Sequence, residues 1–306
     1  MQCALIDIGS NSMRLSVYEI NAAGFRTLFR EKIMAGLAGF VEKKRLSADG
    51  ISRAVNGLMQ FRDTLEKLGI SDVRVFATAS LRNIQNTAEA VSEITARTGY
   101  AIEVLSGFDE AMFGYSGAMR DVGLETGVFV DIGGASTEIV TFSSGRLDGA
   151  VSLPVGSLRL YSDYVKRILP HKGALLRIDT RVKSELASLQ AGKSYDTIVG
   201  VGGTLRAALK LTRRLYSLPA DCKEIDSAAL EGLWQVLIKN DRAAIDLILK
   251  TEPERVHTIV PGIAILREIV QKYGTQKIII SNYGVREGYL CSRIKPEIPA
   301  TPKTES

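Results

Sequence analysis

The sequence predicts an α/β fold with mixed β-sheets flanked by helices, organised as two related halves. Two observations lead to this prediction. A strand–turn–strand pattern occurs twice, at residues 4–20 and 129–143, and segments of helical and strand periodicity alternate along the rest of the chain. The length of 306 residues also suits two domains.

Each copy of the repeated pattern is predicted to be a β-hairpin whose turn is built from small residues. Residues 7–9 and residues 131–133 both read DIG, and Ser12 and Ser136 follow at matching positions. Buried strands avoid aspartate, and strand interiors avoid glycine. An aspartate followed by a glycine-containing turn in both hairpins therefore predicts a ligand-binding position in each half.

The small residues of these turns suit an anionic ligand, because they let the backbone approach closely and successive N–H groups form an anion-binding nest. A third glycine turn, at residues 200–204, precedes a helical segment whose N-terminus can bind an anion. It lacks the spacing of a dinucleotide fingerprint, since position 205 is leucine. Each turn alone is also an ordinary turn, so the prediction depends on three occurring together. The predicted phosphate-binding residues of the turns are Gly9, Ser10, Asn11, Ser12, Gly133, Gly134, Ala135, Ser136, Thr137, Gly202, Gly203 and Thr204.

The remaining elements follow in chain order from periodicity. Residues 1–35 alternate in the manner of strands, and Ser47 is the expected N-cap of the first helix. Helices are predicted at 47–69, 87–99, 227–239 and 260–274, and strands at 73–80 and 277–282.

Composition places the chain among soluble globular proteins, with 45% hydrophobic and 24% charged residues. Its three cysteines are scattered, which fits a reducing, cytoplasmic location, and its two histidines are far apart, which disfavours a histidine-rich zinc site. We expect no signal peptide, no membrane association and no nucleic-acid partner. The net charge of +5 modestly favours an anionic ligand.

Taken together, these residues resemble the exopolyphosphatase and guanosine pentaphosphate phosphohydrolase (Ppx/GppA) family, part of the superfamily of actin, sugar kinases and heat-shock ATPases. The motifs that carry the resemblance run through nearly the whole chain. They are IDIGSNSMRLSVYE (6–19), FATASLRN (76–83), IEVLSGFDEAMFGYSGAM (102–119), VDIGGASTEIV (130–140), SLPVGSLRL (152–160), VGVGGTLRAALKL (199–211) and ISNYGVREGYL (280–290).

The resemblance implies two actin-like (ribonuclease H-like) domains with a ligand cleft between them, in the short two-domain form of the family. The first domain is expected at 1–122 and the second at 123–284. A C-terminal helix at 285–296 is expected to pack back on the first domain. Residues 296–306 form a proline-rich polar tail that we expect to be disordered.

The resemblance also implies the catalytic residues. Glu110 matches the family's catalytic glutamate, which accepts a proton from the attacking water. The family usually has two glutamates before the alanine, and here the first is Asp109, so a shift of one residue in register would make Asp109 the base. Arg82 resembles a phosphate-contacting arginine, and Arg14 and Arg206 are weaker candidates.

A magnesium site is implied in the same way. Asp131 and Glu138 match the family's acidic pair and are assigned to Mg²⁺ and to positioning of the water, and Asp7 is expected to face them from the first domain. The expected substrate is inorganic polyphosphate, from which a terminal phosphate is hydrolysed. Three alternatives stay open: a guanosine pentaphosphate 5′-phosphohydrolase, an ATP-dependent kinase of the superfamily, and a non-enzymatic sensor of a phosphorylated alarmone. Many relatives form homodimers.

Overall fold

The computed structural model describes residues 1–189 and 192–295 and divides into two compact units. The first unit comprises Met1–Phe113 and the chain from Val285 onward, and the second comprises Gly114–Gly284. The division falls inside helix α4 (Gly107–Val122), whereas the sequence placed the boundary after residue 122. The expected disordered tail at 296–306 lies outside the described residues.

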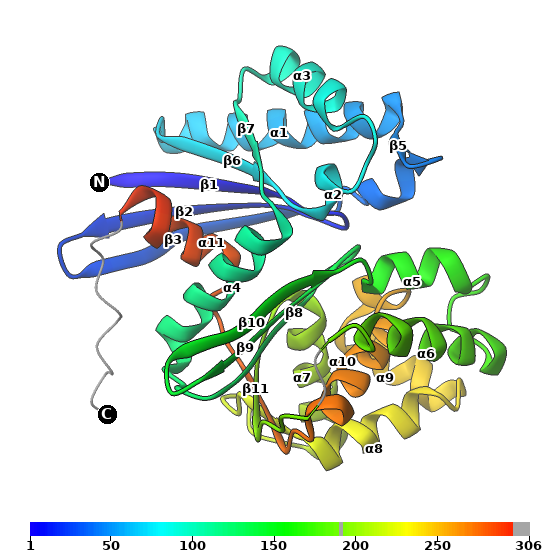
Figure 1. Ribbon diagram of the computed structural model, residues 1–306. Helices are drawn as coiled ribbons and strands as arrows, with labels where there is room; N and C mark the ends of the chain where they lie inside the picture. Colours follow the sequence, from blue (N-terminus) through cyan, green and yellow to red (C-terminus); the bar gives the residue numbers. More distant parts are fainter. Residues whose placement is uncertain (190–191, 296–306) are drawn as a thin grey trace. The chain divides into compact units, whose positions relative to one another are not determined.

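The first unit is built on a five-stranded mixed sheet with the order β3-β2-β1-β6-β7 (Figure 1). Its strands are β1 (Gln2–Ile8), β2 (Met13–Asn21), β3 (Gly24–Ile33), β6 (Val73–Ala77) and β7 (Ile102–Val104). β1, β2 and β3 pair antiparallel, whereas β1, β6 and β7 run parallel. The predicted hairpin is therefore the antiparallel half of the sheet, and its first strand begins the parallel half.

Helices cover both faces of this sheet. They are α1 (Ala48–Leu68), α2 (Ala79–Arg82), α3 (Thr87–Thr98), the first half of α4, α11 (Val285–Tyr289), the 3₁₀-helix η1 (Leu37–Phe40) and the π-helix η3 (Leu290–Ile294). Two short strands, β4 (Val41–Glu42) and β5 (Arg45–Leu46), form a separate two-stranded sheet. Ser47 caps α1 as predicted, because its hydroxyl accepts a hydrogen bond from the N–H of Gly50. The strand predicted at 73–80 ends at Ala77, because the N–H groups of Leu81 and Arg82 bond to the carbonyl of Thr78 and begin α2.

Side chains alternate along β1 and so divide the core of the first unit into two clusters. Ile6 and Ile8 pack with Phe61 of α1 on one face of the sheet. Leu5 lies on the other face with Tyr18, and Tyr289 of α11 packs there too. In that second cluster the ring of Tyr289 stacks on Phe76 at 4.9 Å and meets Phe113 edge-on at 5.5 Å. The C-terminal segment thus completes the hydrophobic core of the first unit.

The second unit repeats the same plan with one extra strand. Its sheet has the order β10-β9-β8-β11-β13-β12, in which β8, β11 and β13 are parallel and the others antiparallel. The strands are β8 (Gly127–Ile132), β9 (Thr137–Ser143), β10 (Arg146–Leu153), β11 (Thr197–Val201), β12 (Glu224–Asp226) and β13 (Lys277–Ile280). Leaving out β12, strand for strand this is the order of the first sheet.

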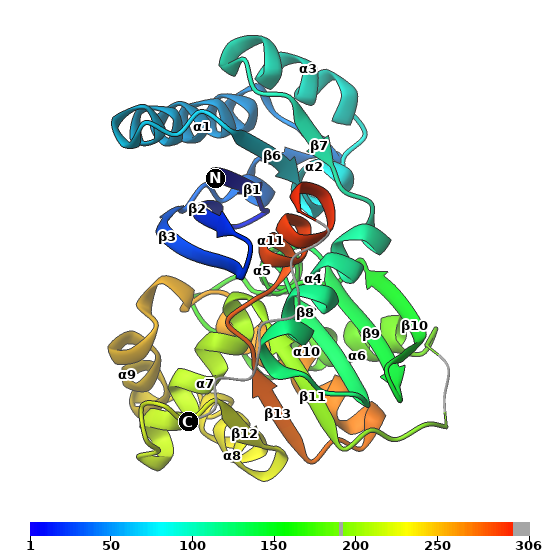
Figure 2. The same cartoon turned by 90° about the vertical axis from the view of Figure 1, so that its left-hand side faces the viewer.

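Helices of the second unit pack mainly on one face of its sheet and enclose the larger apolar core of the chain (Figure 2). They are α5 (Ser157–Tyr164), α6 (Lys172–Leu186), α7 (Gly202–Tyr216), α8 (Ser227–Leu237), α9 (Arg242–Thr251), the 3₁₀-helix η2 (Pro253–Arg255) and α10 (Ile259–Tyr273). On the opposite face, Tyr115 of α4 contacts Phe129 and Phe142. Within the described residues, no helix is both long and apolar enough to cross a membrane.

Candidate active site

The predicted residues of the first unit gather where its parallel strands end. Ile8, Ala77 and Val104 are neighbours in register at the carboxyl ends of β1, β6 and β7. The turn at 9–12 follows β1, Arg82 follows β6 on the short helix α2, and Glu110 follows β7 in the first turn of α4. We call Asp7, this turn, Arg82 and Glu110 the first half-site.

The turn at 9–12 is held through its carbonyl groups. The N–H of Gly9 donates to the carbonyl of Ser12 (3.2 Å), which closes the turn. The N–H of Gly36 then donates to Asn11 O (2.9 Å), and the N–H of Ala38 donates to Ser10 O (3.0 Å). Because the start of η1 takes up carbonyls of the turn, the backbone conformation is fixed while the N–H groups that follow Gly9 can face a ligand.

Asp7 is the last polar residue of β1 and pairs across the hairpin with Arg14. Its Oδ1 atom is buried and accepts no hydrogen bond from the described residues. Burial raises the pKa of the Asp7 carboxyl, the positive charges of Arg14 and Arg286 lower it, and the negative charge of Glu287 raises it. The carboxylate therefore lies in an environment that favours an added positive group.

Arg82 and Glu110 form a direct ion pair. Arg82 Nη1 donates to Glu110 Oε2 at 2.6 Å and to the carbonyl of Leu105 at 3.2 Å. Glu110 is only 7% exposed, although it stands in the first turn of a helix. An arginine that touches both the backbone after β7 and the carboxylate fixes the direction in which the glutamate points.

Asp109, the alternative base, has a different local role. The hydroxyl of Ser106 accepts a hydrogen bond from the N–H of Asp109 (3.0 Å) and donates one to Asp109 Oδ2 (2.7 Å). This is a helix-capping arrangement at the start of α4. The geometry therefore favours Glu110, whose carboxylate is turned inward to Arg82, over Asp109 as the base.

The turn between β8 and β9 in the second unit is closed in the same way as the first. The N–H of Gly133 donates to Ser136 O at 2.9 Å. The start of α5 then binds the carbonyls of the turn. The N–H of Ser157 donates to Gly133 O, and the N–H groups of Leu158 and Arg159 both donate to Gly134 O, each at 2.9 Å. Helix N–H groups that would otherwise need a cap are thus used to hold the turn.

The acidic pair of the second unit lies side by side on this hairpin. Asp131 and Glu138 are cross-strand partners in the β8–β9 register. Glu138 is 1% exposed and accepts a hydrogen bond from the hydroxyl of Ser152 (2.7 Å). Asp131 Oδ1 lies against the third glycine turn, since a Cβ atom added to Gly202 would come within 2.2 Å of it. We call these carboxylates, the turn at 133–137 and the turn at 202–204 the second half-site.

Helix α7 begins at the third glycine turn. Among the described residues no side chain caps its N-terminus, so its first N–H groups point to a place where an anion can bind. The hydroxyls of Thr137 and Thr204, by contrast, donate to the carbonyls of Val155 (2.6 Å) and Ile132 (3.0 Å) and are buried. We therefore assign these two side chains to holding the turns, and only their backbone N–H groups to phosphate.

Arg255 is a candidate that the sequence did not reveal. Its guanidinium lies so close to Gly203 that a Cβ atom there would be 1.8 Å from Nη2. Its side chain is 15% exposed, and its nearest acidic contact is Glu252 at 3.9 Å. Burial lowers the pKa of Arg255 relative to an exposed arginine. A partly buried cation beside an uncapped helix N-terminus is suited to bind an anion, but only the fold brings it to that turn.

The carboxylates fit a magnesium ion better than a metal that needs many protein ligands. Among the described residues there is no group of three or more His, Cys, Asp or Glu side chains arranged to hold a metal. Mg²⁺ usually takes one or two carboxylates and completes its shell with waters and substrate phosphates. The adjacent pair Asp131 and Glu138 supplies such a set within one unit.

Two mixed sheets of matching strand order, each with an aspartate and a glycine-containing turn at the end of its first strand, form the actin-like fold. The chain belongs to the Ppx/GppA phosphatase family, whose model matches residues 16–297. It is therefore a phosphohydrolase.

Solved structures support the same fold over the full length. An Aquifex aeolicus member of the Ppx/GppA family is 25% identical, with a TM-score of 0.77, and the match covers 97% of this chain and 98% of that chain. An exopolyphosphatase from Cytophaga hutchinsonii is 20% identical, with a TM-score of 0.82 and coverage of 95% and 97%. An exopolyphosphatase-like protein is 23% identical, with a TM-score of 0.80.

Proposed function

We propose that this phosphohydrolase removes the terminal phosphate of inorganic polyphosphate in a Mg²⁺-dependent reaction. The observation that carries the proposal is the pair formed by Glu110 and Arg82, buried where the parallel strands of the first unit end. A glutamate held by an arginine next to an anion-binding turn is the arrangement that hydrolysis of a phosphoanhydride needs.

In this proposal Glu110 accepts a proton from the attacking water. Arg82 keeps the carboxylate oriented, and its guanidinium also carries the positive charge that phosphoryl oxygens need as the bond breaks. The proton on water moves to Glu110, the water oxygen forms the new bond to phosphorus, and the bridging oxygen leaves with the shortened chain. The products are inorganic phosphate and a polyphosphate one unit shorter.

The glycine turns bind the substrate rather than react with it. The backbone N–H groups that follow Gly9 and Gly133 in the two turns, and those at the start of α7, donate to phosphoryl oxygens. Their carbonyls are engaged by η1 and α5, so the donors need little reorganisation when the substrate binds. Arg255 adds a positive charge at the third turn.

Asp131 and Glu138 would hold Mg²⁺ in the second unit. When bound, the ion neutralises negative charge on the phosphoryl oxygens. The hydrogen bond from Ser152 fixes Glu138, and contact with Gly202 fixes Asp131, so that both carboxylates keep one orientation.

We favour polyphosphate because each contact assigned above is made to phosphoryl oxygen. A polyphosphate chain repeats that chemistry at each unit, whereas guanosine pentaphosphate also presents a base and a ribose. Guanosine pentaphosphate has the same terminal phosphoryl group, however, and is the alternative substrate against which the proposal is tested.

The test is phosphate release from long-chain polyphosphate, guanosine pentaphosphate and ATP, each with Mg²⁺ and with EDTA. We expect the highest kcat/KM on polyphosphate and no release in EDTA. Glu110→Gln keeps the shape of the side chain and removes the base, so kcat should fall by about a hundredfold or more. The matched control Asp109→Asn should stay within about threefold of wild type, because the carboxylate of Asp109 bonds to the capping hydroxyl of Ser106.

Each other outcome has a clear meaning. Faster phosphate release from guanosine pentaphosphate than from polyphosphate would make guanosine pentaphosphate the preferred substrate. Tight binding of either compound without turnover would identify a sensor, and transfer of phosphate from ATP to an acceptor would identify a kinase. Full activity in Glu110→Gln would show that Glu110 is not the general base.

A further inference from the structure

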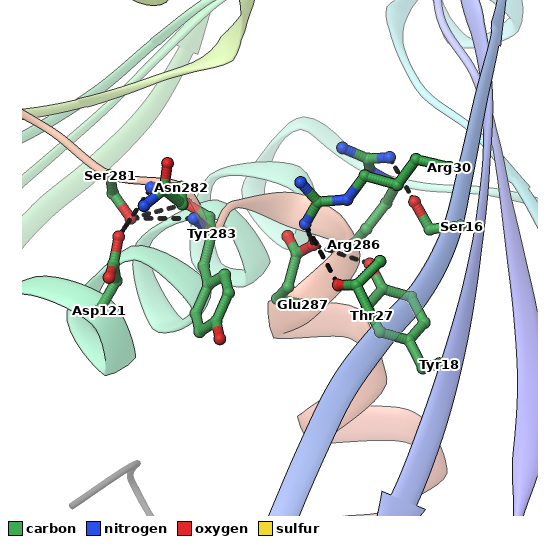
Figure 3. A network of polar contacts seen from close by, with 10 residues as sticks. All are labelled: Ser16, Tyr18, Thr27, Arg30, Asp121, Ser281, Asn282, Tyr283, Arg286 and Glu287. Carbon is green, nitrogen blue, oxygen red and sulfur yellow. Dashed lines mark hydrogen bonds and ion pairs between the residues drawn. The ribbon is translucent and has the colours of Figure 1, made fainter. Parts of the chain in front are cut away.

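A cluster of polar side chains joins α11 to the first hairpin inside the first unit (Figure 3). Glu287 is 1% exposed, accepts a hydrogen bond from the hydroxyl of Tyr18 (2.7 Å) and pairs with Arg30 (3.3 Å). Arg286 Nη1 donates to the hydroxyl of Ser16 at 2.6 Å. The proposed reaction uses none of these residues, although Ser16, Tyr18 and Glu287 are buried and the cluster joins segments far apart in the sequence.

The cluster lies on the same face of the sheet as Asp7. Side chains alternate along a strand, so Asp7 shares its face with Leu5, and Leu5 is the cross-strand partner of Ser16. Arg286, bonded to Ser16, is therefore about 7 Å along the strand from the level of Asp7. Its positive charge acts on the Asp7 carboxylate, as does that of Arg14.

Asp7 needs such a neighbour. Its Oδ1 atom is buried and accepts no hydrogen bond from the described residues. A carboxylate partly removed from water is costly unless positive charge is held close to it. Arg14 supplies one charge from the hairpin itself. Arg286 supplies a second, and its helix is fixed against the sheet by the bonds of Glu287.

We propose that Arg286 is a positioning residue that acts through Asp7. Its guanidinium, anchored on Ser16, holds the Asp7 carboxylate in the conformation that the first half-site requires. Glu287 acts one step further out, because it ties α11 to β2 and β3. The catalytic consequence rests on the proposed function, whereas the coupling between Arg286 and Asp7 does not.

A double-mutant cycle separates this role from simple packing. The variants are Asp7→Asn, Arg286→Gln and the pair, assayed on long-chain polyphosphate with Mg²⁺. Arg286→Gln should lower kcat at least about fivefold in the Asp7 background and less than about twofold in the Asp7→Asn background. Arg286→Lys, which keeps the charge, should recover part of the loss. Equal losses in the two backgrounds would show that Arg286 does not act through Asp7.

The melting temperatures of the same variants give a second measurement of the coupling, and thermal unfolding needs no substrate. Removing Arg286 leaves a buried carboxylate with less compensation, so Arg286→Gln should lower the melting temperature more in the Asp7 background than in Asp7→Asn. Tyr18→Phe is the control: it removes the bond to Glu287, so it should lower the melting temperature equally in both backgrounds and leave kcat within about twofold.

The two readouts distinguish the two proposals. If wild-type protein releases no phosphate, the proposed function fails, and the melting temperatures still decide whether Arg286 and Asp7 are coupled. If wild-type protein is active and both cycles are additive, the role given to Arg286 is overturned and the proposed function stands.

Discussion

The two hairpin turns have nearly the same backbone hydrogen bonds, but the residue opposite the aspartate carries opposite charge. In both, the N–H of the first glycine bonds to the serine three residues on, and the start of a later helix binds the carbonyls of the turn. Asp7 and Asp131 occupy equivalent places at the end of the first strand. Across the hairpin, however, Asp7 meets Arg14, whereas Asp131 meets Glu138.

This difference shows how one repeated motif can serve two chemical tasks. A carboxylate beside arginines gives little net negative charge and is suited to phosphoryl oxygens and the attacking water. Two adjacent carboxylates concentrate negative charge and attract a divalent cation. The two hairpins therefore share the backbone of the turn and differ in the side chain opposite each aspartate.

The largest expected effect comes from exchanging the two aspartates for asparagine one at a time. Asp131→Asn should lower kcat about a hundredfold or more and raise the Mg²⁺ concentration that gives half-maximal activity at least about tenfold, because it removes half of the acidic pair. Asp7→Asn should lower kcat with a smaller shift in that concentration. Titrations of activity against Mg²⁺ measure both. Equal shifts of that Mg²⁺ concentration in the two variants would contradict the different roles assigned to the two aspartates.

The hydrogen bonds by which α5 and η1 hold the carbonyls of the two turns offer a second test. A Cβ atom on Gly156 would lie 2.5 Å from the backbone of Gly134, so Gly156→Ala must displace the second turn. We expect a loss of about tenfold or more in kcat/KM and about 1–3 kcal/mol in the free energy of unfolding. Gly39 lies in η1, which holds the first turn, and has open space around it. Gly39→Ala should therefore change neither quantity measurably.

A third test concerns Arg255. Arg255→Gln removes a cation beside the third turn, so KM for polyphosphate should rise about tenfold while kcat changes less. Steady-state kinetics at fixed Mg²⁺ measure the two constants. Lys210→Gln is a control on the same side of the second unit, since Lys210 is exposed and paired with Glu252. A similar rise in KM for both variants would mean that general charge, rather than the position of Arg255, controls binding.

Sequence reasoning predicted those parts of the fold that are local in the chain. The two hairpins and the glycine turn before α7 each have a local pattern, and the alternation of helices and strands predicted two mixed sheets. Glu110 as the base stays a prediction, and the sequence alone could not show that its carboxylate, rather than that of Asp109, faces Arg82.

The residues that the sequence did not reveal are those placed by tertiary packing. Arg255 precedes α10 yet lies against Gly203, and Arg286 follows β13 yet bonds to Ser16 on β2. Arg255 lies outside the motifs of the chain, and Arg286 lies in the motif at 280–290 but received no role there, because an arginine before or within a helix is ordinary. The sequence likewise did not show that the hydroxyls of Thr137 and Thr204 bond to backbone carbonyls.

The smallest expected effect extends the comparison to buried carboxylates away from the turns. Glu268 on α10 is 5% exposed and bonds with Asp179 of α6, while Arg267 (3.3 Å) and Lys183 (3.8 Å) also face it. Burial, together with the hydrogen bond and negative charge of Asp179, raises the pKa of Glu268 to about 7. Asp7 has a second acid nearby only in Glu287, whereas Glu268 has Asp179 beside it as well as two cations.

A raised carboxyl pKa stabilises the folded protein at pH values below the ordinary carboxyl pKa, and the stabilisation is lost as pH rises through about 7. The lowered pKa of Asp179 has the opposite effect, but only at more acidic pH. Between pH 5 and pH 8, wild-type protein should therefore lose about 1–2 kcal/mol of unfolding free energy relative to Glu268→Gln. Urea unfolding at pH 5, 6, 7 and 8 measures the difference. The same loss in both proteins would show that Glu268 does not titrate in this range, and that the second unit compensates its buried acid as the first compensates Asp7.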